Sequence, residues 1–143
     1  MPRKQKPSAP RRLKVLAAVI KKRGRILIAR RKSTDRFGGQ WEFPGGKLEA
    51  GETPEDCLRR EMTEEFGIET RIGRFLGSVR SDLPGFAIEL DAYDIIHLAG
   101  EFELRDHDEI RWVMPSELAG FELTEPDRRL LDRILKKPGE TPR

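Results

Sequence analysis

The helix predicted for residues 53–66 carries three carboxylates whose type and spacing could do chemistry: Glu61, Glu64 and Glu65. On a wheel of about 100° per residue they share one arc of about 100°, directly beside the apolar stripe of the same helix. No lysine or arginine follows any of them four residues later, and Glu61 and Glu65 are themselves a repulsive pair at that spacing. Acids crowded at the margin of a core favour a bound cation, and a few hard oxygen ligands are typical of Mg²⁺.

An inert, solvent-exposed acidic face is the alternative interpretation of this cluster. The residues around it favour the metal site. Gly45 and Gly46 let the backbone approach a ligand closely or adopt a positive φ. Glu52 lies just before the helix, and Arg60 could orient either Glu52 or one of the helix acids. Together these residues predict a loop and a helix that hold a metal ion and a pyrophosphate group.

The same stretch matches the Nudix box, G-x5-E-x7-R-E-U-x-E-E-x-G-U with U apolar, at nine fixed positions over 23 residues. The matching residues are Gly46, Glu52, Arg60, Glu61, Met62, Glu64, Glu65, Gly67 and Ile68. The chain therefore resembles the Nudix hydrolases over about residues 13–135. Residues 41–47, with the sequence WEFPGGK, resemble the MutT-like branch, which includes 8-oxo-dGTP and CTP-type pyrophosphohydrolases.

This resemblance implies the fold and the catalytic residues. The fold would be the Nudix α/β/α sandwich, an α+β fold with a mixed β-sheet and a central loop–helix catalytic motif. The implied cofactor is Mg²⁺, for which Mn²⁺ can substitute. Its implied ligands are Glu61, Glu64, Glu65 and the carbonyl group of Gly45. Arg60 and Glu52 would pair and orient the acids, while Glu61 would be a metal ligand, the general base, or both.

A further acid of the site is implied by residues 106–112, DHDEIRW, which resemble the family's acid–His motif ahead of a strand. Asp106 matches the acid that assists the metal or the attacking water. It is shorter than the more usual glutamate, so Asp108 and Glu109 are alternatives. His107 is expected to be structural rather than a catalytic base.

The resemblance also implies substrate-binding residues: Arg31, Glu42, Phe43, Lys47 and Asp127. Arg31 matches an arginine that contacts the substrate, the alternative being a solvated charge at a strand edge. Phe43 could stack on a base, a contact worth roughly 1–3 kcal/mol, or belong to the core. Asp127 matches the residue that reads the base edge, where a carboxylate favours bases with an amino group. Its alternative is an acid in the first turn of a helix, where the helix dipole favours negative charge.

We expect, on this resemblance, Mg²⁺-dependent hydrolysis of a nucleoside or deoxynucleoside triphosphate, a damaged or modified one included, to monophosphate and pyrophosphate. Such a reaction would sanitise the nucleotide pool. Three alternatives stay open. They are a pyrophosphatase for ADP-ribose or another diphosphate-linked nucleoside, a non-catalytic Nudix recognition module, and an RNA-binding protein that uses a basic tail.

The elements that must position these residues follow from apolar runs and turn signals. Strands are predicted at residues 13–20, 25–31, 41–43, 70–80, 86–96 and 109–113, with a break at 44–46 and a turn at 82–85. The helix at 53–66 has Thr53 as its N-cap, Pro54 in its first turn and Gly67 as its terminator. A helical turn at 115–118 and a closing helix at 124–135 complete one domain.

Charge separates the ends of the chain from its middle. The formal net charge is +3, but residues 1–14 carry six cations and no acid, and residues 136–143 are also basic, so the part between is acidic. We expect a disordered basic tail at 1–12, a Nudix domain at 13–135 and a C-terminal tail at 136–143. No apolar run reaches the length of a membrane span, and Cys57 is the only cysteine. A cytoplasmic monomer or homodimer that binds a small nucleotide, and neither membrane nor nucleic acid, is therefore expected.

Overall fold

The computed structural model of this 143-residue chain describes residues 11–34 and 38–135. Its strands are β1 (Arg11–Lys22), β2 (Arg25–Arg31), β3 (Trp41–Glu42), β4 (Gly45–Lys47), β5 (Glu69–Leu83), β6 (Phe86–Ala99) and β7 (His107–Val113). Its helices are α1 (Pro54–Phe66), the 3₁₀ helix η1 (Pro115–Gly120) and α2 (Glu125–Leu135). The predictions for residues 1–10 and 136–143 lie outside the described residues.

Helix α1 begins and ends where its capping residues predict. The side-chain oxygen of Thr53 accepts a hydrogen bond from the amide of Asp56 at 3.1 Å, and Pro54 stands in the first turn. Gly67 adopts the left-handed conformation, with φ at 68°, and its amide bonds back to the carbonyl of Thr63. These caps fix the length of the helix, and so the position of its acids.

Strand β1 is the centre of one mixed seven-stranded sheet. The order is β3-β2-β1-β6-β5, with β4 added to β1 and β7 added to β2. β1 runs parallel to β6 from the pair Arg11–Phe86 to the pair Ile20–Ile95, and antiparallel to β4 and β2. Because β1 pairs with β2 only at their shared turn, the two strands diverge and leave β4 room beside β1.

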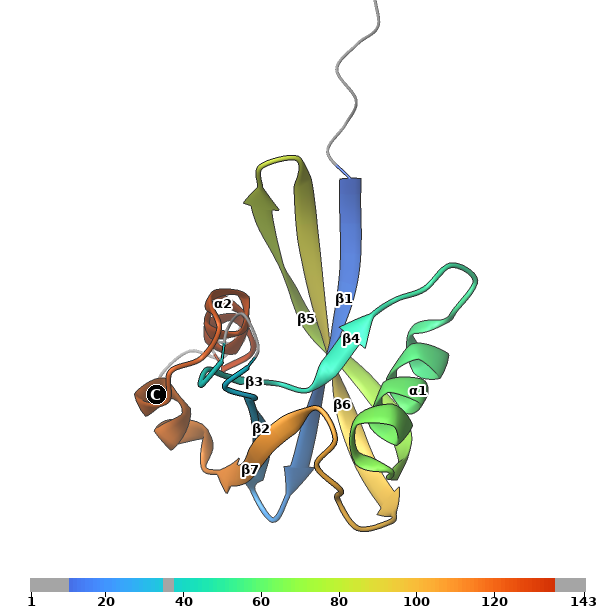
Figure 1. Cartoon of the computed structure of the whole chain (residues 1–143), viewed down its shortest axis with the longest axis vertical. Helices are drawn as coiled ribbons and strands as arrows, with labels where there is room; N and C mark the ends of the chain where they lie inside the picture. The colour runs from blue at the N-terminus through green and yellow to red at the C-terminus, as the bar shows by residue number, and fades with distance from the viewer. Residues whose placement is uncertain (1–10, 35–37, 136–143) are drawn as a thin grey trace, which may run out of the picture.

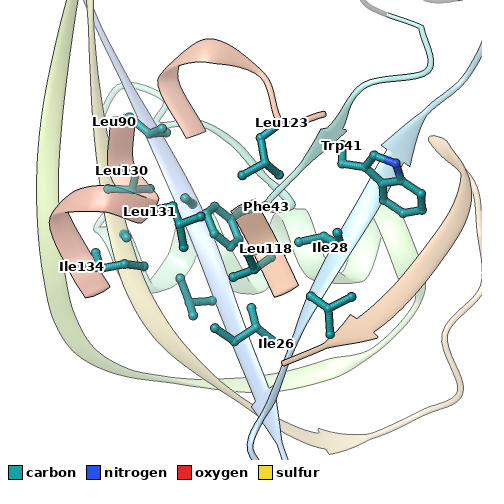
Figure 2. Close-up of a cluster of buried hydrophobic side chains, with 14 residues drawn as sticks. Ile26, Ile28, Trp41, Phe43, Leu90, Leu118, Leu123, Leu130, Leu131 and Ile134 are labelled. Carbon is teal, nitrogen blue, oxygen red and sulfur yellow. The ribbon is translucent and has the colours of Figure 1, made fainter. Parts of the chain in front are cut away.

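The two α-helices lie on opposite sides of the strands, which confirms the expected α/β/α sandwich (Figure 1). β1 is apolar on both faces because both are covered: Leu16, Ala18 and Ile20 pack in the cluster that contains α1, whereas Ala17 and Val19 pack in the other cluster. Figure 2 shows that second cluster, in which Phe43 lies among side chains of η1 and α2. Within the described residues, no helix is long and apolar enough to cross a membrane.

Pairing within the sheet explains three of the differences between the strands and their predicted bounds. The predicted break at residues 44–46 contains β4, because the amides and carbonyls of Gly45 and Gly46 pair with β1. β1 begins at Arg11, and β5 and β6 extend to a turn at Pro84–Gly85, because β6 pairs with β1 from the pair Arg11–Phe86 onward and with β5 up to the pair Leu83–Phe86. β7 begins at His107 rather than residue 109, since His107 pairs with Arg31 across a β-bulge.

Candidate active site

Glu52 and Arg60 form the ion pair that the resemblance implies. The guanidinium of Arg60 donates to both carboxylate oxygens of Glu52, at 2.6 and 2.9 Å. This pair, with the amide of Glu49 as a second donor, lowers the pKa of Glu52 to about 2. Arg60 also donates to the carbonyl of Lys47 at 3.3 Å. The pair therefore ties the loop after β4 to the middle of α1.

Arg60 also corrects the inference that the acids of α1 have no nearby cation. The three helix acids have no cation four residues after them, but Arg60, which precedes them, lies 3.0 Å from Glu61 and 3.4 Å from Glu64. The i, i+4 geometry of a helix accounts for the contact with Glu64. The acid cluster is thus partly neutralised from its N-terminal side.

The two glycines of β4 make room for the site. A side chain at Gly45 would collide with the carbonyl of Leu16, and φ at Gly45 is 151°, within the region that glycine favours. A side chain at Gly46 would collide with the carboxyl group of Glu61. β4 can therefore lie against β1 on one side and against the acids of α1 on the other.

A cavity of about 380 Å³ gathers most of the predicted metal ligands. Its lining residues are Arg31, Lys32, Glu42, Gly45, Glu61, Glu65, Asp106 and His107. Asp106 lines this cavity. Asp108 and Glu109, the alternatives to Asp106, instead form ion pairs with Arg30, at 2.7 Å and 3.3 Å. The structure thus brings Asp106 to the acids of α1.

Glu65 is a carboxyl group buried beside this cavity, with only 4% of the residue exposed. Its Oε1 has no hydrogen-bond partner in the described part of the chain. Burial and the neighbouring Glu61 raise the pKa of Glu65 to about 10, and Glu42 and Asp106 add to the effect. A divalent cation would supply the missing partner and the missing charge, so the donor set fits the expected metal.

The predicted ligands do not all converge. The side chain of Glu64 is 58% exposed, contacts Arg60 and lines no part of the cavity. Across residues 11–34 and 38–135, no three His, Cys, Asp or Glu side chains are close enough together to hold one ion. Glu64 therefore lies apart from Glu61 and Glu65, on the Arg60 side of α1.

Glu42 connects the acid cavity with residues far away in the sequence. Its two oxygens contact Nη1 of Arg31 at 2.7 Å and Nε2 of His107 at 2.8 Å. His107 is buried and stacks on Phe66, with ring centroids 5.7 Å apart. His107, which we expected to be structural, is thus buried against Phe66 and Glu42 and also lines the acid cavity. Its contact with Glu42 had no signal in the sequence.

A second cavity, of about 560 Å³, adjoins the first, and Arg31, Glu42 and Gly45 line both. Asp127 lies in its wall, where Oδ2 accepts hydrogen bonds from the amide of Phe43 at 3.2 Å and the hydroxyl of Thr124 at 2.9 Å. Burial raises the pKa of Asp127 to about 7, and the charge of Glu42 adds to this rise.

Two other substrate predictions have different outcomes. Phe43 is 4% exposed and both packs in the core and lines the second cavity, so its two interpretations are not exclusive. Lys47 is exposed and lines neither cavity. The structure does not bring its side chain to the other predicted substrate residues.

Several residues that line the second cavity were not among the predicted substrate residues. They are Val15, Gln40, Ser81, Leu83, Ile88, Leu90 and Glu125. Most of them come from β1, from the long β5–β6 hairpin and from the start of α2. An alternating strand pattern could have assigned Ile88 and Leu90 to one face, but only the pairing of β6 with β1 places that face over the cavity.

The chain is similar to known proteins over most of its length. The family model described as NUDIX domain matches residues 10–134. The chain is 33% identical to the CTP pyrophosphohydrolase of Escherichia coli K12, over 86% of this chain and 91% of that protein. It is 31% identical to the 8-oxo-dGTP diphosphatase of Haemophilus influenzae, over 87% of this chain and 93% of that protein.

Solved structures show the same fold. The solution structure of the E. coli ORF135 protein matches with a TM-score of 0.81 at 32% identity, over 88% of this chain and 90% of that chain. The crystal structure of the MutT protein from Methanosarcina mazei Go1 matches with a TM-score of 0.77 at 27% identity, over 92% of this chain and 100% of that chain.

Proposed function

The chain belongs to the Nudix family of hydrolases, and we propose that it hydrolyses a nucleoside or deoxynucleoside triphosphate, with Mg²⁺, to the monophosphate and pyrophosphate. Nudix hydrolases generally use a divalent metal, and MutT-type members act on small nucleotides. Mg²⁺ is the proposed ion because the donors beside Glu65 are hard oxygens and few in number. Mn²⁺ would substitute for it.

The observation that carries the proposal is the shared wall of the two cavities. The larger one is partly apolar and carries the buried Asp127, which suits a base. The smaller one carries Glu61, Glu65 and Asp106, which suits phosphate groups with their cation. Because Arg31, Glu42 and Gly45 line both, a nucleotide could reach from one to the other, with its diphosphate linkage beside the acids.

Each residue has a proposed part in the reaction. A divalent cation in the acid cavity would offset the charge on the phosphate oxygens and acidify the attacking water. Arg31, held by Glu42, would face the phosphates at the boundary between the cavities. Glu52 and Arg60 would hold Glu61 in place, and Glu61 would bind the cation or accept the proton of the water. The oxygen of the water would form a new bond to the α or the β phosphorus, the bond from that phosphorus to the bridging oxygen would break, and the monophosphate and pyrophosphate would leave, one of them with the oxygen of the water.

The substrate base is proposed from Asp127. Because its Oδ2 already accepts two hydrogen bonds, Oδ1 is the oxygen left for a ligand. An ionised Oδ1 would accept from an exocyclic amino group, as cytosine and guanine present. The proposed substrates are therefore cytosine or guanine nucleotides, their oxidised or methylated forms included, in line with the names of the relatives.

A nucleotide panel tests the function. The purified chain would be given CTP, dCTP, 5-methyl-dCTP, dGTP, 8-oxo-dGTP, UTP, dTTP and ADP-ribose, with Mg²⁺ or with EDTA, and the products separated by ion exchange. We expect monophosphate and pyrophosphate from a cytosine or guanine nucleotide in Mg²⁺ only. Faster turnover of ADP-ribose than of every triphosphate would replace the proposal by the pyrophosphatase alternative. Loss of turnover in Glu61→Gln would assign the activity to this site.

A further inference from the structure

Arg105, in the segment between β6 and β7, binds the C-terminal end of α1. Its Nη1 donates to the carbonyl of Thr63 at 2.9 Å and to that of Glu64 at 3.3 Å. Its Nη2 donates to the carboxylate of Glu103 at 2.8 Å. A side chain at Gly67 would come within 2.9 Å of Nη2, so the guanidinium lies in space that the terminating glycine leaves open.

This contact places a positive charge at the C-terminal end of α1. The last carbonyls of an α-helix have no intrahelical partner, and a cation is favoured there. α1 has no basic residue of its own in its last turn. The amide of Gly67 already donates to the carbonyl of Thr63, so Arg105 adds a second donor there, a donor for the carbonyl of Glu64, and the positive charge that the last turn of α1 lacks.

Two further contacts hold the same segment against α1. The ring of Phe102 meets that of Phe66 at 5.4 Å, edge to face, and the amide of Glu103 donates to the carbonyl of Phe66 at 2.9 Å. In Figure 1 this segment passes beside the C-terminal end of α1 on its way to β7. Residues 102, 103 and 105 are thus fixed to the last turns of the helix that carries Glu61 and Glu65.

The residue that follows Arg105 is Asp106, which lines the acid cavity with Glu61 and Glu65. On the other side of Asp106, His107 is held by Glu42 and by Phe66. Arg105 is therefore the last tie to α1 before the chain enters the cavity.

We propose that Arg105 is a positioning residue, which holds Asp106 beside Glu61 and Glu65 and so sets the affinity of this cavity for a divalent cation. The inference rests on the proposed metal site. It differs from a purely structural role for Arg105, because a simple helix cap would stabilise the fold without acting through Asp106.

The test is a double-mutant cycle of Arg105→Ala and Asp106→Asn, with Arg105→Lys as the conservative variant. Arg74→Ala is the matched control, since the side chain of Arg74 is 71% exposed and lies 4.0 Å from Asp94, away from the acid cavity. For each variant, MgCl₂ is titrated against the melting temperature of the nucleotide-free protein, which gives the half-saturating concentration without any need for hydrolysis. kcat and KM are measured in parallel.

We expect Arg105→Ala to raise the half-saturating Mg²⁺ concentration by roughly tenfold, as the loss of a residue that orients a ligand does. Arg105→Lys should restore part of that loss, and Arg74→Ala should match the wild type. In the Asp106→Asn background, Arg105→Ala should add no further change in Mg²⁺ affinity. kcat should fall at low Mg²⁺, with little change in KM for the nucleotide.

Additive losses in the double variant would overturn the inference, as would unchanged Mg²⁺ affinity in a merely less stable Arg105→Ala. A wild-type protein that binds Mg²⁺ but hydrolyses no triphosphate would overturn the proposed function and leave the cycle valid. A wild-type protein whose melting temperature does not respond to Mg²⁺ or Mn²⁺ would overturn the metal site and this inference together.

Discussion

Gly46 leaves open the space that the carboxyl group of Glu61 fills. The relationship joins two positions of the Nudix box that are 15 residues apart, one on β4 and one on α1. This relationship explains why the first position of the box is a glycine. Any side chain at position 46 would displace Glu61, which we propose as a metal ligand or the general base.

Gly46→Ala should therefore lower kcat by about a hundredfold, since a displacement of a catalytic group by about 1 Å has an effect of that size. Far-UV circular dichroism should show an intact fold. Gly120→Ala is the control, because a Cβ at Gly120 meets nothing within 4 Å. Activity near that of the wild type in Gly46→Ala would mean that the position of Glu61 is not critical.

Glu65→Gln should raise the melting temperature of the metal-free protein by a few degrees and abolish its increase with Mg²⁺. The reason is that burial keeps the folded Glu65 carboxyl protonated at neutral pH, whereas the unfolded chain ionises it, so folding must take up a proton that an amide does not need. Glu64→Gln should leave the metal-free melting temperature unchanged, since Glu64 is exposed, and should still lower kcat by orders of magnitude. A Glu65→Gln protein that keeps its response to Mg²⁺ would remove Glu65 from the metal site.

Stability should depend on pH through Asp127. Its pKa is raised in the folded state to about 7, so the folded protein holds a proton that the unfolded chain releases, and stability falls as pH rises from about 4 through 7. Two nearby charges shift the pKa of Asp127 in opposite directions: Glu42 raises it and Arg31 lowers it. Asp127→Asn removes the titration and keeps an acceptor for Phe43 and Thr124.

The variant should thus be more stable than the wild type at pH 8, by an amount on the order of a few kcal/mol, and similar to it near pH 4. Urea unfolding at both pH values measures the difference. A constant difference between the two proteins from pH 4 to 8 would show that Asp127 does not titrate in this range.

The local elements were predictable because their signals are local. Thr53, Pro54 and Gly67 fix α1 within the sequence that forms it, and the box places Glu61 and Glu65 on one side of it. The contact of Glu42 with His107 was not predictable, because it joins residues 65 positions apart through the pairing of β2 with β3 and β7. Nor was the pairing of Gly45 and Gly46 with β1, since two glycines after a proline are typical of a turn.

The selection of the substrate base should also depend on Asp127. Asp127→Ala should lower kcat/KM for the preferred cytosine or guanine nucleotide by roughly tenfold to a few hundredfold, because an amino group then loses its acceptor. The loss for a uracil nucleotide should be much smaller, since uracil has no amino group to offer. Equal losses for all bases would mean that Asp127 only joins α2 to Phe43, through the bonds seen here.

The position of bond cleavage tests the central claim most directly. The preferred nucleoside triphosphate is hydrolysed with Mg²⁺ in ¹⁸O-labelled water, and the products are identified by mass spectrometry and by ³¹P NMR. Our account predicts that monophosphate and pyrophosphate form in equal amounts, with the label in one of the two and no orthophosphate. Stoichiometric orthophosphate as the first product, with a nucleoside diphosphate beside it, would contradict pyrophosphohydrolysis at this site.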